Sequence, residues 1–226
     1  MTNNNNFNTV FESLEAWMDR RNQKSHPVLI EHKGYLNPTE ENAKPIPGQD
    51  KFPNNVIPYV LYQNEREIKE FVEILLRGET KSALEVGMGA YGATHKLWSL
   101  IFDKVTSIDN DIRAIQGYIS SNSDAHPAKS TFLHADSSNP FISNLLDKEY
   151  DFIFIDGNHS YYYVLNDYFN LRRHARPGSI IGFHDILGEG VGRFIEELEQ
   201  GKVEGTPKEV KKICHSIEQG IGYFYV

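Results

Sequence analysis

The sequence predicts an α/β fold with a doubly wound, mostly parallel sheet. From residue 80 onward, short apolar stretches alternate with amphipathic ones, which is the order of strands and helices in a sheet covered on both faces. A turn with three glycines, Gly87, Gly89 and Gly92, separates the first of these strands from the next helix. Two apolar stretches flank Gly220 near the end of the chain, so we expect the sheet to end with an antiparallel strand.

Residues 1–79 are expected to form a helical and loop extension ahead of the sheet domain, which spans residues 80–226. Residues 10–23 carry apolar side chains at helical spacing and predict a short amphipathic helix. Six prolines between residues 27 and 58 interrupt the segment that follows, and we expect residues 24–60 to be an ordered lid that shapes a substrate pocket. Asn64 and Glu67 are typical of a helix start, and Gly78 of its end.

The sheet domain is expected to contain five parallel strands and a closing hairpin. The strands are expected at residues 83–86, 104–109, 131–135, 151–155 and 179–183, and the hairpin at residues 210–214 and 223–226. Helices are expected at residues 94–102, 111–121, 140–146, 161–174 and 191–199. Pro177 and Gly178 predict a turn before the fifth strand.

Composition and charge narrow the class of function. The chain has 226 residues, of which 39% are hydrophobic and 24% charged, as in globular proteins. Its formal net charge of -8 argues against a nucleic-acid partner, because there is no basic surplus to contact phosphates. Cys214 is the only cysteine, and no apolar run approaches the roughly 20 residues of a membrane helix. The asparagine-rich start is unlike a signal peptide, so we expect a cytoplasmic protein with no membrane partner.

Polar residues or glycines end all five expected parallel strands, at the sheet edge where ligands bind in this class of fold. These ends are Gly87, Asp109, Asp136, Asp156 and the pair His184-Asp185. Any one aspartate could be a helix cap or a turn former, but five such ends on one edge favour a binding site. Asp109 could accept hydrogen bonds from both hydroxyls of a ribose, in a nicotinamide cofactor or another nucleoside. Glu85, two residues before the glycine turn, suits a ligand with an ammonium group better than a pyrophosphate.

Four motifs together resemble the class I S-adenosylmethionine-dependent methyltransferases. They are Glu85-Val-Gly-Met-Gly89, Ser107-Ile-Asp109, His134-Ala-Asp136-Ser137 and Asp151-Phe-Ile-Phe-Ile-Asp156-Gly-Asn-His159. The stretch of residues 151–185 is similar to a narrower group, the small-molecule O-methyltransferases related to macrocin and cephalosporin-tailoring enzymes. The resemblance covers about residues 80–226. It implies a Rossmann-like sheet with an antiparallel C-terminal strand and S-adenosylmethionine as the cofactor.

The resemblance also implies roles for the residues at the strand ends. Residues implied in cofactor binding are Glu85, Gly87, Gly89, Asp109, Asn110, Asp136 and Ser137. Among these, Asp109 would hold the ribose and Asp136 the adenine amine, and alanine at Gly87 is expected to weaken cofactor binding more than folding.

A catalytic and metal-binding group is implied at the ends of the fourth and fifth strands. Asp156 and Asp185 match metal ligands of metal-dependent relatives, while His184 stands where a carboxylate is expected. This leaves the divalent metal open between magnesium and manganese, iron or zinc. In the alternative arrangement His184 points away and leaves the site to Asp185 and waters. His159 matches a general base and, with Asp156, is implied in catalysis. The alternative is that His159 only hydrogen-bonds its turn. The other seven histidines, including His95, are expected at the surface.

Three functions are compatible with these residues. The leading one is metal-assisted O-methylation of a small oxygen-rich acceptor, such as a sugar or a natural product. The second is a metal-dependent oxygenase or hydrolase on the same fold, and the third is a non-catalytic cofactor-binding module. The sequence leaves open the identity of the acceptor, the need for a metal, the role of residues 24–60 and whether the chain forms a homo-oligomer.

Overall fold

The computed structural model describes residues 7–25, 61, 63–89, 92–121, 129–147, 149–205, 207 and 209–226. Residues 26–60 lie outside this described part, so the lid expected at residues 24–60 stays a prediction.

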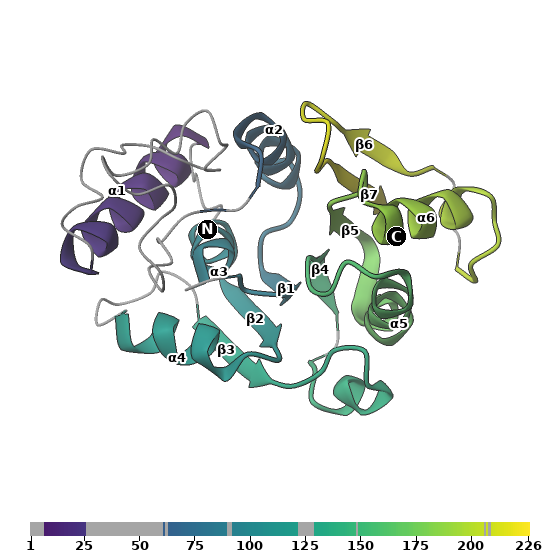
Figure 1. Ribbon diagram of the computed structural model, residues 1–226, viewed down its shortest axis with the longest axis horizontal. Helices are drawn as coiled ribbons and strands as arrows, with labels where there is room; N and C mark the ends of the chain where they lie inside the picture. The colour runs from purple at the N-terminus through teal and green to yellow at the C-terminus, as the bar shows by residue number, and fades with distance from the viewer. Residues whose placement is uncertain are drawn as a thin grey trace, which may run out of the picture.

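Within the described residues, seven strands form one sheet at the centre of the molecule (Figure 1). In chain order they are β1 (Ser82–Val86), β2 (Lys104–Asp109), β3 (Lys129–His134), β4 (Tyr150–Ile155), β5 (Ala175–His184), β6 (Lys211–Ile213) and β7 (Ile221–Tyr225). Their order across the sheet is β3-β2-β1-β4-β5-β7-β6. The first five strands are parallel, and β7 is antiparallel to both β5 and β6. The predicted fold class is confirmed.

Strand order reverses between β1 and β4, which is where ligands bind in doubly wound sheets. Backbone hydrogen bonds continue past the ends of these strands. The Gly87 amide donates to the carbonyl of Ile108 at 2.9 Å, and the Asp156 amide donates to that of Val86 at 3.0 Å. The polar residues that follow β1, β2 and β4 are therefore held side by side at the carboxyl edge of the sheet.

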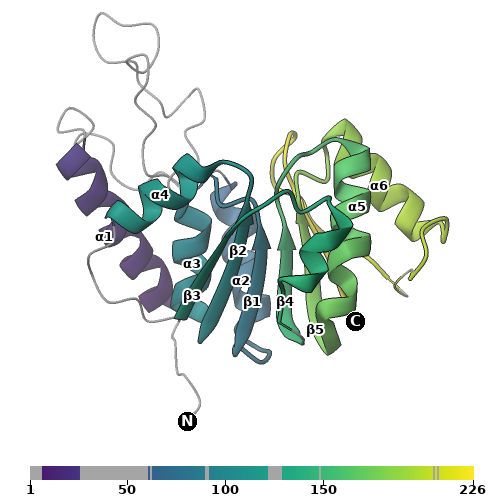
Figure 2. The same cartoon turned by 90° about the horizontal axis from the view of Figure 1, so that it is seen from below.

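Helices cover both faces of the sheet (Figure 2). One face carries α1 (Phe7–Ser25), α2 (Glu65–Leu75), α3 (Ala93–Ile101) and α4 (Ile112–Ser121). The other carries α5 (Tyr161–Leu171), α6 (Glu189–Glu199) and the short 3-10 helix η3 (Pro140–Asn144). Because strand side chains alternate, Phe152 and Phe154 pack into the first layer while Ile153 and Ile155 pack into the second.

The apolar stripe predicted for the first helix is buried in the first layer. Leu14 and Trp17 of α1 belong to the same hydrophobic cluster as α2, α3 and the sheet. Trp17 packs beside Tyr118 of α4, with ring centroids 6.1 Å apart. The two N-terminal helices therefore share the hydrophobic core that supports the sheet edge.

Two local predictions differ from the structure. The turn expected at Pro177 and Gly178 lies inside β5. The pairing of β4 with β5 shifts in register between Tyr150 and Phe152, and Pro177 and Gly178 lie in the resulting bulge. Gly178 has a φ of 85°, and its amide donates to the carbonyl of Val226 at 2.7 Å. The helix expected to reach residue 174 ends at Leu171 and is followed by the 3-10 turn η4 (Arg172–His174).

His95 lies in the core rather than at the surface. Its two ring nitrogens contact the hydroxyls of Ser107 and Ser130 at 2.7 and 2.9 Å, so burial leaves its polar atoms hydrogen-bonded. His174 is also buried, and its Nδ1 lies 2.9 Å from the carbonyl oxygen of Asp147.

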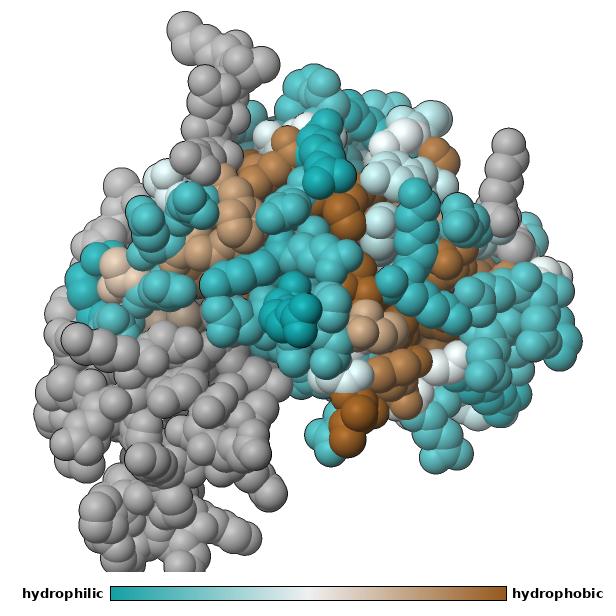
Figure 3. Space-filling model, turned by 90° about the horizontal axis from the view of Figure 1, so that it is seen from above, coloured by the Kyte–Doolittle hydropathy of each residue, from teal (hydrophilic) through white to brown (hydrophobic). Residues whose placement is uncertain are grey.

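One face of the molecule is mostly polar. Figure 3 shows one face, on which hydrophilic residues dominate and hydrophobic residues appear as narrow strips. Among the described helices, none combines the length and apolar character that crossing a membrane would require.

Candidate active site

The turn after β1 brings the backbone of two strands together. Gly87 and Gly89 have φ values of 82° and 63°, a region that glycine adopts without strain. A Cβ on Gly87 would lie 2.1 Å from the backbone oxygen of Asp156, whereas a Cβ on Gly89 would meet nothing closer than Thr94 Oγ1 at 3.8 Å. The expectation that alanine at Gly87 harms binding more than folding is revised, because the clash is with the protein itself.

A cavity of about 360 Å³ follows this turn along the carboxyl edge of the sheet. Its lining residues are Val86, Gly87, Gly89, Ile108, Asp109, Asn110, Ala135, Asp136, Ser137, Asp156, Gly157, Asn158, Tyr163 and Asp167. The lining includes every residue predicted for cofactor binding except Glu85. Asp109 and Asp156, which are distant in sequence, therefore open onto one cavity.

Glu85 lies in the core instead of the cavity wall. Its side chain is buried, and its Oε2 accepts a hydrogen bond from the hydroxyl of Ser107 at 2.5 Å. Burial is the main cause that raises the pKa of this carboxyl well above its ordinary value. Glu85 is therefore absent from the cavity lining, although it lies near enough to Asp156 and Asp109 for their charges to raise its pKa further.

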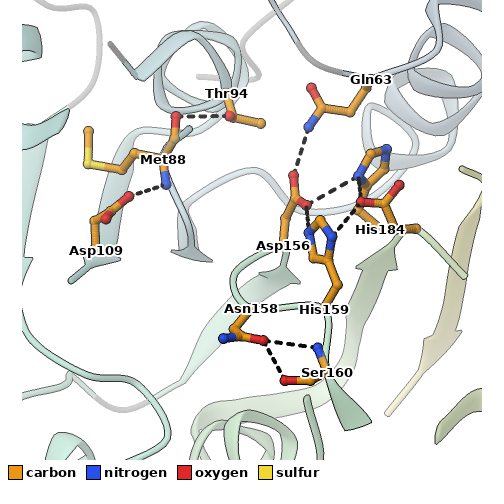
Figure 4. Close-up of polar contacts among 10 residues, drawn as sticks. Gln63, Met88, Thr94, Asp109, Asp156, Asn158, His159, Ser160 and His184 are labelled. Carbon is orange, nitrogen blue, oxygen red and sulfur yellow. Dashed lines mark hydrogen bonds and ion pairs between the residues drawn. The ribbon is translucent and has the colours of Figure 1, made fainter. Parts of the chain in front are cut away.

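Asp109 links the turns that follow β1 and β2 (Figure 4). Its Oδ2 accepts from the Met88 amide at 2.9 Å, and its Oδ1 accepts from the Asp111 amide at 2.7 Å. Asp136 at the end of β3 is more local, since its Oδ1 accepts from the amide and hydroxyl of Ser138 at 2.9 and 2.7 Å. Both carboxylates are thus oriented by backbone amides at the edge of the cavity.

Four side chains form a compact cluster next to the cavity, at the ends of β4 and β5 (Figure 4). Nδ1 of His184 lies 3.2 Å from both Asp156 Oδ1 and Asp185 Oδ2. His159 lies between the same carboxylates, with Nε2 3.5 Å from Asp156 Oδ1 and Nδ1 3.2 Å from Asp185 Oδ2. All four residues predicted for catalysis or metal binding are brought together.

One sequence match bears on this site. Residues 85–186, which run from the glycine turn to the loop after β5, match a family described as a methyltransferase domain. This part of the chain is therefore similar to that family, and the fold is that of the class I S-adenosylmethionine-dependent methyltransferases. No curated protein matches the chain.

Solved structures share the fold of this methyltransferase at low sequence identity. SMU.1697c of Streptococcus mutans, a methyltransferase solved with S-adenosylhomocysteine, is 11% identical, with a TM-score of 0.54 over 71% of this chain and 98% of that one. The N-methyltransferase NodS of Bradyrhizobium japonicum, also solved with S-adenosylhomocysteine, is 16% identical, with a TM-score of 0.51 over 96% and 97%.

A third neighbour is MycE, a methyltransferase of the mycinamycin biosynthetic pathway solved with Mg and S-adenosylhomocysteine. It is 15% identical, with a TM-score of 0.51, and the match covers 69% of this chain and 48% of MycE. At these identities the likeness shows the fold alone.

One residue of the methyltransferase cluster comes from the N-terminal part of the chain and was missed in the sequence. Gln63 donates from Nε2 to Asp156 Oδ2 at 2.7 Å, and its side chain is almost fully buried (Figure 4). The next residue, Asn64, caps α2 by accepting from the amides of Arg66 and Glu67. The start of α2 thereby fixes Gln63 over the cluster. A glutamine in front of a helix cap carries no sequence signal for such a role.

Asp185 has a strained backbone that the N-terminal region supports. Its φ of 56° is uncommon outside glycine. The next residues bond the hairpin loop, since the Leu187 amide donates to the carbonyl of Gln219 at 2.9 Å. That loop is held in turn by buried Glu67 of α2, which accepts from the Gly220 amide at 3.0 Å. The position of Asp185 therefore depends on a chain of contacts that leads back to α2.

The charged groups of the cluster shift one another's pKa values. Burial raises the pKa of Asp156, but His184 and His159 lower it by more, to about 2. Burial lowers the pKa of His184, yet the charges and hydrogen bonds of Asp156 and Asp185 raise it to about 10. The hydrogen bond to Asp156 is the main cause that raises the pKa of His159. The protonated His184 ring thus offsets part of the negative charge of the two carboxylates, in the place where a divalent cation could do the same.

Two further lining residues, Tyr163 and Asp167, come from α5, and of these Asp167 was missed in the sequence. Asp167 lies three residues after Val164, on the face that helical periodicity buries. That spacing is the signal that would have placed it inside.

Proposed function

We propose that this methyltransferase transfers the methyl group of S-adenosylmethionine to a hydroxyl of a small oxygen-rich acceptor, at a site that holds a divalent cation. The observation that carries the proposal is that Asp156 belongs to both parts of the site. It lines the cavity, and its carboxylate contacts His184 and His159. A methyl donor in the cavity would therefore meet an acceptor oxygen at the cluster, and such alignment lowers the barrier of an in-line displacement.

The cavity supports S-adenosylmethionine as its ligand. Its volume of about 360 Å³ falls in the range of small-molecule sites, roughly 300–1,000 Å³. We expect Asp109 to accept hydrogen bonds from the ribose hydroxyls and Asp136 to accept from the adenine amine. The sulfonium end would then lie near Gly87 and Asp156, where the cavity reaches the cluster.

The donor set of the cluster fits a divalent cation. Asp156, His184 and Asp185 each offer one ligand atom, and these atoms lie within 4.8 Å of one another. Two carboxylates and an imidazole suit manganese or iron better than magnesium. A bound cation would supply positive charge that lowers the pKa of the acceptor hydroxyl and would fix an acceptor with adjacent oxygens.

His159 is the member of the cluster best placed to take the acceptor proton. Its side chain is 52% exposed, whereas those of Asp156, His184 and Asp185 are 17% exposed or less. A neutral ring at this position accepts the hydroxyl proton during transfer, and the flanking carboxylates stabilise the imidazolium that forms. Gln63 holds the Asp156 carboxylate in place through its hydrogen bond.

Methyl transfer from labelled S-adenosylmethionine into a mixture of sugars, phenols and amines tests this function. With manganese present, we expect label on a hydroxyl. The label should be lost on chelation and in Asp156→Ala, and kept in Asp111→Ala, which removes an exposed acid outside the cavity. Label on an amine, or transfer that chelation leaves unchanged, would overturn the hydroxyl or the cation part of the proposal. Binding of S-adenosylhomocysteine without transfer to any acceptor would favour the non-catalytic module, and unmethylated oxidised or hydrolysed products would favour the second alternative.

A further inference from the structure

Asp167 is a buried acid in the wall of the cavity that the proposed chemistry does not use. It lies in the middle of α5 and is 1% exposed, and it lines the cavity together with Asp136 and Ser137. The Ser137 hydroxyl donates a hydrogen bond to its carboxyl. Its Oδ1 has no hydrogen-bond partner among the described residues. A buried polar atom of this kind is costly unless a ligand satisfies it.

Two other buried acids, Glu67 and Asp151, are held by several donors, whereas Glu85 has one hydroxyl partner like Asp167 but does not line the cavity. Glu67 accepts from the backbone amides of His215, Ser216 and Gly220. Asp151 accepts from the amides of Lys81 and Ser82 and pairs with the guanidinium of Arg176 at 2.5 Å. These two acids join segments of the fold, so their role is structural. Among the described residues, neither a backbone amide nor a cation contacts the Asp167 carboxyl, so its burial does not serve the fold in the same way.

The position of Asp167 is at the base-binding end of the cavity. Asp136 and Ser137, which follow β3, are the residues expected beside the adenine, and Ser137 contacts Asp167 directly. On the other side, a Cβ on Gly157 would lie 3.8 Å from Asp167 Oδ2, so the loop after β4 passes next to this carboxyl. Asp109, the expected ribose ligand, contributes to the same lining from the end of β2.

An adenine at this end needs a donor as well as acceptors. Its exocyclic amine donates, and the exposed carboxylate of Asp136 can accept that bond, but its ring nitrogens only accept. A protonated carboxyl is a donor. Burial raises the pKa of Asp167 to about 7, with Asp136 raising it further and the Ser137 hydroxyl opposing this, so a proton is available near neutrality. The other titratable groups in the lining are Asp109, Asp156 and Tyr163.

We propose that Asp167 is a specificity residue of the cofactor site, whose carboxyl proton is donated to a ring nitrogen of the adenine. The inference rests on S-adenosylmethionine being the cofactor, but not on the acceptor or the cation. It explains why an acid with a single hydroxyl partner is kept in the wall of a ligand cavity.

Calorimetric titration of S-adenosylhomocysteine into the full-length protein at pH 6 and pH 8 tests this role. Wild type should bind about 10-fold more weakly at pH 8, because only the protonated form is competent. Asp167→Asn keeps a donor that does not titrate, so it should bind with the same affinity at both pH values. This variant is the matched control for every other group that titrates in this range. Asp167→Ala should bind at least about 10-fold more weakly than wild type at pH 6, with no further loss at pH 8.

Analogues of S-adenosylhomocysteine in which one adenine ring nitrogen is replaced by C–H give a second readout. Wild type should bind one of these analogues about 10-fold more weakly than it binds S-adenosylhomocysteine. Asp167→Ala should bind the same analogue no more weakly than it binds S-adenosylhomocysteine. The melting temperature of the ligand-free Asp167→Asn protein should equal or exceed that of wild type, because the change removes a poorly satisfied acid.

Several results would overturn the inference. Equal affinity of Asp167→Ala and wild type at pH 6 would do so, as would a pH effect that persists in Asp167→Asn. A clear drop in the melting temperature of ligand-free Asp167→Asn would show a structural acid instead. Failure of wild type to bind S-adenosylhomocysteine would overturn both this inference and the cofactor assignment. If the Asp167 variants bind S-adenosylhomocysteine as expected but no hydroxyl is methylated, only the proposed function is overturned.

Discussion

The two halves of the carboxyl edge hold their acids in different ways. In the cofactor half, Asp109 and Asp136 accept from backbone amides two residues further along, at Asp111 and Ser138, and Asp109 also accepts from the Met88 amide in the turn after β1. In the cluster half, Asp156 contacts side chains that are 93 and 28 residues away, Gln63 and His184. The first half is therefore oriented by its own turns, whereas the second is assembled by the tertiary fold. The two should respond differently to substitution.

The largest difference is expected for Asp156→Asn. Losing the negative charge that faces His184 and His159 should reduce methyl transfer by about 1,000-fold or more, because both cation binding and the orientation of the base are affected. The affinity for S-adenosylhomocysteine should stay within about 5-fold of wild type, since one hydrogen bond in the lining is altered. Initial rates and calorimetry measure the two quantities. If the affinity for S-adenosylhomocysteine falls as far as the rate of methyl transfer, the two halves act as one unit.

The same contrast explains what the sequence could predict. The strand ends that line the cavity could be predicted because parallel strands deliver their carboxyl ends to one edge, and short motifs mark those ends. Gln63 could not, because its partner Asp156 is 93 residues away and the contact exists only after α2 has packed. Glu85 was placed in the cavity by resemblance. Strand alternation instead puts it on the face of Ala83, beneath α3, where Ser107 contacts it.

Gly87→Ala tests the backbone contact that joins the two halves. The new Cβ would lie 2.1 Å from the Asp156 backbone oxygen at a positive φ, so the free energy of unfolding should fall by about 3 kcal/mol or more. Gly89→Ala is the matched control, because its φ is also positive but its nearest neighbour is 3.8 Å away. It should cost about 1 kcal/mol. Urea unfolding of both variants decides this, and equal losses would mean that φ alone is responsible.

Gln63→Ala tests the contribution of α2 to the cluster half. Removing the amide that donates to Asp156 Oδ2 should weaken manganese binding by about 10- to 100-fold, as for other residues that orient a metal ligand. Manganese affinity is measured from the electron paramagnetic resonance signal of the free ion. Asn64→Ala is the control: it removes the cap of α2, should lower the free energy of unfolding by about 1 kcal/mol, and leaves Gln63 in the chain. If both variants lose manganese affinity equally, helix stability rather than the Gln63 bond is responsible.

The smallest effect is expected for Asp136→Ala in the cofactor half. Its carboxylate is exposed and accepts only from Ser138 in its own turn among the hydrogen bonds of the described residues, so the free energy of unfolding should fall by about 1 kcal/mol or less. S-adenosylhomocysteine should bind about 5-fold more weakly, because one acceptor for the adenine amine is lost. Manganese affinity should not change, since the side-chain hydrogen bonds of the turn after β3 among the described residues do not involve the cluster. Ser138→Ala, which keeps the carboxylate but removes one of its partners, should bind the cofactor like wild type. A loss of manganese affinity in Asp136→Ala would show that the turn after β3 affects the cluster at the ends of β4 and β5.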